Sequence, residues 1–83
     1  MYFIYAIYNS KYNKIYIGQT IDLEQRLRLH NEKEFKDSYT SRFDGKWELV
    51  YAEKAIDRKS ALKREKELKS YQGRQFIKRH IPQ

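Results

Sequence analysis

Two short segments near the start of the chain are rich in aromatic and β-branched residues, and a turn-forming stretch separates them. The segments are residues 2–8 and 14–19, and the polar stretch between them is residues 9–13. Such segments favour β-strands, and asparagine and serine favour the turn. The chain is therefore predicted to begin with an antiparallel hairpin. Since an isolated hairpin is only marginally stable, the rest of the chain must supply a further strand and helical cover.

The length of the turn decides which side chains share a face of this hairpin. With a turn of four residues, the numbers of two paired residues add up to an odd number. Side chains alternate between the two faces along each strand. Tyr5 and Tyr16 then project from one face, together with Gly18. The other face is aliphatic and carries Ile4, Ala6, Ile15 and Ile17. A turn of three or five residues would break this agreement.

The segment after the hairpin has the pattern of a helix. Thr20 is expected to cap it, with Asp22 and Glu24 in the first turn, and the helix is expected to end at about Glu32. We expect a polar loop over residues 33–45 and a third strand over residues 47–53. A second helix is expected over residues 58–71, and a short last helix over residues 75–80.

Two residues mark the limits of the second helix. Asp57 can cap its start, and Gly73 is expected to separate it from the last helix. The order strand, strand, helix, strand, helix, helix predicts an α+β fold, with a small three-stranded antiparallel sheet flanked by helices.

Length and composition narrow the class of protein. The 83 residues allow one domain, over residues 1–83, and the absence of Cys excludes disulfides and thiolate zinc sites. No apolar run approaches the ~20 residues of a membrane helix, and the N-terminus has no signal-peptide pattern. We therefore expect a soluble, cytoplasmic protein.

The charge points to a polyanionic partner. Lys and Arg total 18 and Asp and Glu total 11, which gives a net charge of +7. Nucleic acid is the commonest such partner, although a basic surface can also serve solubility alone. A C-terminal basic cluster could follow phosphates, or could equally be a solvated face; it consists of Lys69, Arg74, Lys78 and Arg79.

One carboxylate lies in the apolar stripe of the second helix. Glu65 is four residues after Ala61, three after Leu62 and three before Leu68, so on a helix it shares their stripe. A carboxylate on a core-facing stripe is costly unless a cation, a proton or a metal meets it. The alternative is a surface ion pair with Lys69, four residues on, which would be worth little.

Four short motifs occur in order along the chain. They are Phe3-Ile4-Tyr5, Tyr16-Ile17-Gly18, Arg26-x-x-x-His30 and Ala61-x-x-x-Glu65. Together they resemble the GIY-YIG nuclease domain, and the resemblance extends over about residues 2–78. The tail from residue 65 to residue 76 is similar to that of the small stand-alone bacterial proteins of this family. Phe3 stands where the family name has glycine, which a strand can accommodate.

The resemblance implies metal-dependent hydrolysis of phosphodiester bonds in DNA. Members of the family act in DNA repair, restriction and mobile-intron homing. Their site uses two tyrosines, an arginine, often a histidine, and a helix glutamate that binds one divalent cation. Carried over by motif, the site residues are Tyr5, Tyr16, Arg26, His30 and Glu65.

Each of these residues has a role that the chemistry needs. Glu65 would hold one Mg²⁺ or Mn²⁺, a Lewis acid for the leaving oxygen, with waters and a substrate phosphate completing its shell. Arg26 would grip the non-bridging oxygens. Tyr5 would orient or deprotonate the attacking water, which requires nearby cations because a phenol titrates near ~10. Tyr16 and His30 would hydrogen-bond this water or Tyr5, and His30 could relay the proton.

The same residues also have plain structural interpretations. Strand tyrosines are commonly core residues, and Arg26 and His30 could form a solvated helix face. If they form a site, we expect all five side chains to converge on one concave surface. Glu65 would then be partly buried, unpaired by any close lysine and open to a hydrated metal. Gln72 or Gln75 could replace a late asparagine that some family members use.

Two other functions remain open on the sequence alone. One is a non-catalytic nucleic-acid-binding module on the same fold, and the other is a small protein-interaction domain with a basic surface. The joint presence of the five polar residues favours the nuclease. Its partner would be DNA, branched or flapped forms included. A homodimer is an option, because a single site must dimerise or act twice to cut both strands.

Overall fold

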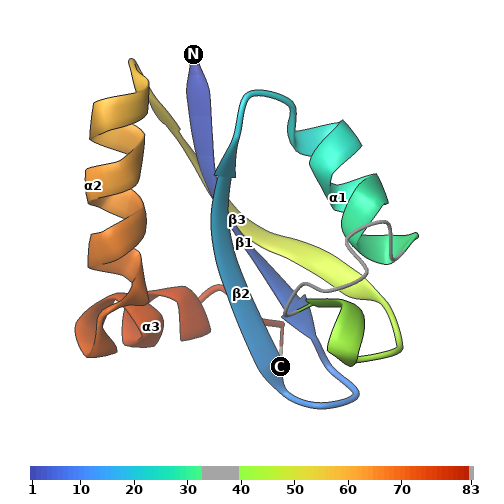
Figure 1. The fold of residues 1–83 in the computed structure, drawn as a ribbon. Helices are drawn as coiled ribbons and strands as arrows, with labels where there is room; N and C mark the ends of the chain where they lie inside the picture. The colour runs from blue at the N-terminus through green and yellow to red at the C-terminus, as the bar shows by residue number, and fades with distance from the viewer. Residues whose placement is uncertain (33–39, 83) are drawn as a thin grey trace.

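The computed structural model describes residues 1–32 and 40–82. Its elements follow in the order β1 (Tyr2–Asn9), β2 (Lys14–Thr20), α1 (Leu23–Asn31), a 3₁₀ turn η1 (Thr40–Arg42), β3 (Trp47–Ala55), α2 (Arg58–Lys69) and α3 (Tyr71–Lys78) (Figure 1). β1 is the central strand and pairs antiparallel with both β2 and β3. The predicted α+β fold and its element order are confirmed, although residues 33–39 of the expected loop lie outside the described residues.

The register of the hairpin is the one that a four-residue turn gives. Tyr5 pairs with Gly18, and Ile7 pairs with Tyr16. Paired residues project to the same side of a sheet, so both tyrosines lie on one face, as predicted. Ala6 is paired with Ile17 on the opposite, aliphatic face.

Helices cover both faces of the sheet. α2 and α3 lie on one side and α1 lies on the other (Figure 1). The aliphatic face packs against α2 and α3 in a core of Ile4, Ala6, Ile17, Ala55, Ala61, Leu68 and Ile77. The tyrosine face packs beneath α1 in a second core of Tyr5, Ile7 and Trp47, with Leu23 and Leu27 against it. The tyrosine face is thus covered by α1, and β2 is an edge strand of the sheet.

The cap of α1 differs from the prediction. Its N-cap is Asp22, whose carboxylate accepts the backbone N–H of Gln25 at 3.1 Å. Thr20 instead ends β2, and its hydroxyl accepts the N–H of Asp22 at 3.2 Å. The prediction of Thr20 was wrong because strand pairing with Phe3 continues through this residue. The predicted cap of α2 is confirmed, since Asp57 accepts the N–H of Ser60 at 2.8 Å.

The break between the last two helices lies at Ser70, so the prediction of Gly73 was wrong. The Ser70 hydroxyl accepts the N–H of Gly73 at 3.1 Å and caps α3, which therefore starts before the glycine. A Cβ on Gly73 would lie 2.3 Å from the carbonyl oxygen of Glu67 and 2.4 Å from Cα of Leu68. This glycine is required by the close approach of the two helices and not by a helix end.

None of the described helices has the length and apolar character that crossing a membrane requires.

Candidate functional site

A buried chain of polar contacts runs from Tyr5 into the layer beneath α1. The hydroxyl of Tyr5 and Nε2 of His30 lie 2.8 Å apart, and Nδ1 of His30 lies 2.8 Å from the hydroxyl of Thr40. The indole N–H of Trp47 donates to the carbonyl oxygen of Thr40 at 3.2 Å. All four residues are buried. Contacts on both ring nitrogens fix the orientation of the imidazole, as in sites where histidine moves protons.

Thr40 is a contributor to this network that the sequence did not reveal. It is the first residue of η1 and is 1% exposed. The sequence places it in a stretch that was expected to be a polar loop, where a threonine gives no signal of burial. Its contact with His30 exists only because η1 folds against α1 and Trp47.

Tyr16 and Gly18 complete the surroundings of the Tyr5 hydroxyl. The ring of half-buried Tyr16 lies 5.1 Å from the ring of His30 and 6.3 Å from that of Tyr5. A Cβ on Gly18 would lie only 2.8 Å from the Tyr5 hydroxyl oxygen. Glycine is thus needed on β2 for the Tyr5 side chain to lie across this strand toward the sheet edge.

Burial keeps Tyr5 in its neutral form. Its pKa is raised well above the ordinary value, first by burial and then by the neighbouring Tyr16 and the Glu65 carboxylate, while Arg26 opposes the rise. Arg26 and Glu65 are therefore both within electrostatic range of Tyr5. A phenol that acts as a base at neutral pH needs nearby cations to lower its pKa, but Arg26 does not offset the effect of burial on the pKa of Tyr5.

Glu65 lies in the layer of helices on the opposite side of the sheet from α1. Its helix, α2, packs on the aliphatic face, opposite to the face that carries Tyr5 and Tyr16. That all five side chains converge on one concave surface stays a prediction. The Glu65 carboxylate nevertheless contributes to the raised pKa of Tyr5, after burial and Tyr16. Because the Tyr5 hydroxyl lies over edge strand β2, against which α2 also packs, this influence acts past the edge of the sheet.

The surroundings of Glu65 confirm one expectation and overturn another. Its side chain is 18% exposed, which is the predicted partial burial. It is not free of lysine, because Nζ of Lys69 lies 2.6 Å from its Oε2, one helical turn away. The apolar stripe is also narrower than expected, since Ala61 and Leu68 are buried but Leu62 is 48% exposed.

Whether Glu65 could hold a metal depends on the side chains around it that could coordinate an ion. Within residues 1–32 and 40–82, no group of three or more histidine and carboxylate side chains could enclose an ion. Mg²⁺ does not require such a cage, because it keeps several waters and is held by one or two carboxylates and substrate phosphates. The Lys69 ammonium shows that the Glu65 carboxylate accepts a cation in this position. The residues present fit a hydrated divalent ion held by one carboxylate.

The remaining candidates lie around α3 and the end of α2. Arg74 donates from Nε to the carbonyl oxygen of Lys69 at 3.2 Å, and it lines a pocket together with Lys78. Arg79 is exposed and forms the C-cap of α3. Gln72 lines a separate pocket between α2 and α3, and Gln75 is half-buried on α3. Neither glutamine belongs to the Tyr5–His30–Thr40 network.

Comparison with known proteins gave one match. A family model described as the GIY-YIG catalytic domain matches residues 1–78. Neither a search of curated proteins nor a search of solved structures found a match. The matched residues run from β1 to the end of α3, so they include every candidate residue described above except Arg79.

Proposed function

Since the chain belongs to the GIY-YIG family, we propose that it is an endonuclease that hydrolyses DNA phosphodiester bonds with one divalent cation held by Glu65. The observation that carries the proposal is the buried contact of 2.8 Å between Tyr5 and His30, with Arg26 and Glu65 both in electrostatic range. A buried titratable group whose pKa is strongly shifted, with charged side chains of both signs nearby, is typical of catalytic sites.

Tyr5 and His30 would act together on the attacking water. A neutral phenol can take a proton from water only if it releases its own proton at the same time. His30 is the acceptor when its Nδ1–H donates to the Thr40 hydroxyl, since Nε2 then carries the lone pair that faces Tyr5. The water oxygen would bond to phosphorus, and the bond from phosphorus to the leaving oxygen would break, as the water proton passes to Tyr5 and the phenolic proton passes to His30. This relay removes the need for a pre-formed phenolate at neutral pH.

Arg26 and Tyr16 would handle the substrate. Arg26 is partly exposed on α1, and its positive charge lowers the pKa of Tyr5. Its guanidinium could therefore bind a phosphate group beside the water. Its planar fork suits two non-bridging oxygens. Tyr16, half-buried next to His30, would hydrogen-bond the water or the phosphate from the solvent side.

Glu65 would supply the metal ligand. When bound, a divalent cation stabilises charge on the leaving oxygen as a Lewis acid. Lys69 would have to release the Glu65 oxygen that it contacts, which its 47% exposed side chain can do without disturbing the core.

A non-catalytic nucleic-acid-binding module is the second candidate. The contact of 2.6 Å between Lys69 and Glu65 favours it, because the lysine already neutralises the carboxylate that would hold a metal. This module would bind DNA in a salt-dependent way and would leave it intact.

The experiment that separates these functions is a cleavage assay with linear, flapped and branched DNA, each with Mg²⁺, with Mn²⁺ and with EDTA. The nuclease predicts products only with metal, and a loss of at least about a hundredfold in rate for Arg26→Ala, since a charge-assisted phosphate contact is removed. Equal rates for Arg26→Ala and wild type would identify a contaminating nuclease. Intact DNA on every substrate, together with salt-sensitive binding, would assign the binding module.

A further inference from the structure

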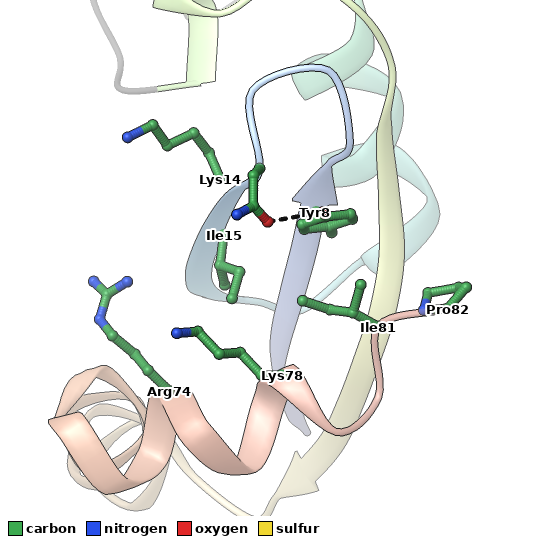
Figure 2. A pocket seen from close by; sticks show the side chains of 8 residues that line it. Tyr8, Lys14, Ile15, Arg74, Lys78, Ile81 and Pro82 are labelled. Carbon is green, nitrogen blue, oxygen red and sulfur yellow. Dashed lines mark hydrogen bonds between the residues drawn. The ribbon is translucent and has the colours of Figure 1, made fainter.

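The pocket lined by Arg74 and Lys78 lies outside the Tyr5 network. It has a volume of about 560 Å³ and lies between α3, the C-terminal residues after it and the start of β2 (Figure 2). Its floor is apolar, its rim is basic, and no acidic residue is among the described residues that line it: Tyr8, Asn13, Lys14, Ile15, Arg74, Lys78, Ile81 and Pro82. A pocket of this composition suits an anion that also carries an apolar part.

The cationic ends of the rim reach toward the same side of the pocket. Figure 2 shows Lys14, Arg74 and Lys78 extending in one direction from β2 and α3. All three are exposed, and within the described chain none of them forms an ion pair. Nε of Arg74 is anchored on the carbonyl oxygen of Lys69, and Nζ of Lys14 lies 5.7 Å from the centre of the Phe43 ring. These contacts hold the side chains in place but do not neutralise their charge.

The pocket and the Tyr5 network share one edge of the sheet. Lys14 begins β2, and Gly18, which lies against the Tyr5 hydroxyl, is four residues further along this strand. At ~3.3 Å per residue, the two positions are about 13 Å apart. On the helical side, Arg74 contacts Lys69, which contacts Glu65. Lys69, Arg74 and Lys78 thus place positive charge between Glu65 and the pocket on the helical side, and Lys14 adds one cation at the start of β2.

We propose that this pocket binds the sugar–phosphate backbone of a DNA strand beside the phosphate that is cut. Lys14, Arg74 and Lys78 bind phosphate oxygens, and Ile15 and Pro82 pack against the sugar. Contacts of this kind fix the register of the nucleic acid without reading its sequence. The inference rests on the proposed function, because it takes the site of cutting as its reference point.

The test is DNA binding by the full chain in EDTA, measured by fluorescence anisotropy over a series of salt concentrations. The double variant Arg74→Ala/Lys78→Ala removes two cations of the pocket. Its matched control, Lys54→Ala/Arg58→Ala, removes one lysine and one arginine that are exposed outside the pocket, Lys54 on the opposite edge strand β3. Circular dichroism shows whether each variant is folded.

For the pocket variant we expect the slope of log K against log salt to become shallower by about two, because each phosphate contact contributes ~0.9 to the slope. The affinity at 0.1 M salt should fall on the order of tenfold or more. The control should stay near the wild-type values. Equal losses in both variants, or a wild-type slope for the pocket variant, would overturn the proposal. Competition by millimolar pyrophosphate as strong as that by a DNA strand of equal phosphate concentration would also overturn it, in favour of a small-anion site.

This experiment separates the inference from the proposed function. If the wild type cuts DNA with metal but the pocket variant keeps the wild-type KM and salt slope, the pocket assignment fails alone. If the wild type cuts nothing but the pocket variant loses salt-dependent affinity and the control does not, backbone binding stands and the nuclease fails.

Discussion

Nζ of Lys69 lies 2.6 Å from Oε2 of Glu65, one turn along α2. The side chains are 47% and 18% exposed, so this ion pair is partly solvated and is worth ~0–1 kcal/mol to the fold. In the proposed nuclease, the lysine would compete with a metal for the carboxylate.

Removal of this competing charge is expected to strengthen metal binding. Lys69→Met should raise the affinity for Mn²⁺ by up to about fivefold, because an ion pair of ~1 kcal/mol no longer has to be broken. Isothermal titration calorimetry measures the affinity, and chemical denaturation should show a stability change below ~1 kcal/mol. Lys66→Met, an exposed neighbour on α2, is the control. Unchanged or weaker binding in the Lys69 variant would show that the lysine does not compete.

The contact between His30 and Thr40 predicts a role for Thr40 in positioning the imidazole. Thr40→Val should lower the single-turnover cleavage rate by about ten- to a hundredfold, because the imidazole loses the partner that keeps Nε2 free for Tyr5. It should also cost ~1–3 kcal/mol of stability, since a buried polar atom loses its partner. Thr40→Ser keeps the hydroxyl and should restore the rate. A slow Ser variant would assign Thr40 a packing role only.

Gly18 and Tyr5 are expected to be coupled energetically. Gly18→Ala should destabilise the fold by ~1–3 kcal/mol, because its Cβ would lie 2.8 Å from the Tyr5 hydroxyl oxygen. In Gly18→Ala/Tyr5→Phe, this oxygen is absent, so the added cost of the alanine should be smaller than in wild type. A double-mutant cycle by urea denaturation measures the difference. Strict additivity would contradict the close approach.

Alkaline pH should expose the raised pKa of Tyr5. The unfolded tyrosine ionises near its ordinary pKa of 10.0, whereas the folded one keeps its proton to higher pH. Above about pH 10 the folded state therefore binds more protons than the unfolded state, so stability falls as pH rises. Tyr5→Phe should show a smaller fall from pH 10 upward when both proteins are denatured with urea at each pH. Parallel curves would mean that Tyr5 titrates alike in both states.

The strands could be predicted well because their signals are local and mutually consistent. The pairing of Tyr5 with Gly18 follows from turn length and from the alternation of side chains, both of which the sequence carries. The ends of the helices were harder to predict from the sequence. Asp22, rather than Thr20, caps α1 because strand pairing holds Thr20, and Gly73 lies inside α3 because the packing of two helices requires it.

The sequence proposes the candidate site as a set of residues but gives few of its contacts. Motif spacing selected Tyr5, His30 and Glu65, yet it could not show that Tyr5 and His30 lie 2.8 Å apart. Nor could it show that Thr40 folds back onto His30, since this contact joins residues ten positions apart through a turn without a strong local pattern. Such long-range contacts depend on how layers pack, which one sequence does not encode in any short segment.

The proposed nuclease depends on Glu65 as its metal ligand, and single-turnover cleavage by Glu65→Gln tests this role. The control is Glu67→Gln, which neutralises an exposed carboxylate on the same helix that contacts Arg64 at 3.4 Å. With saturating Mg²⁺, we expect a rate at least about a thousandfold below wild type for Glu65→Gln and a rate near wild type for Glu67→Gln. Equal, metal-dependent cleavage by Glu65→Gln and wild type would contradict it.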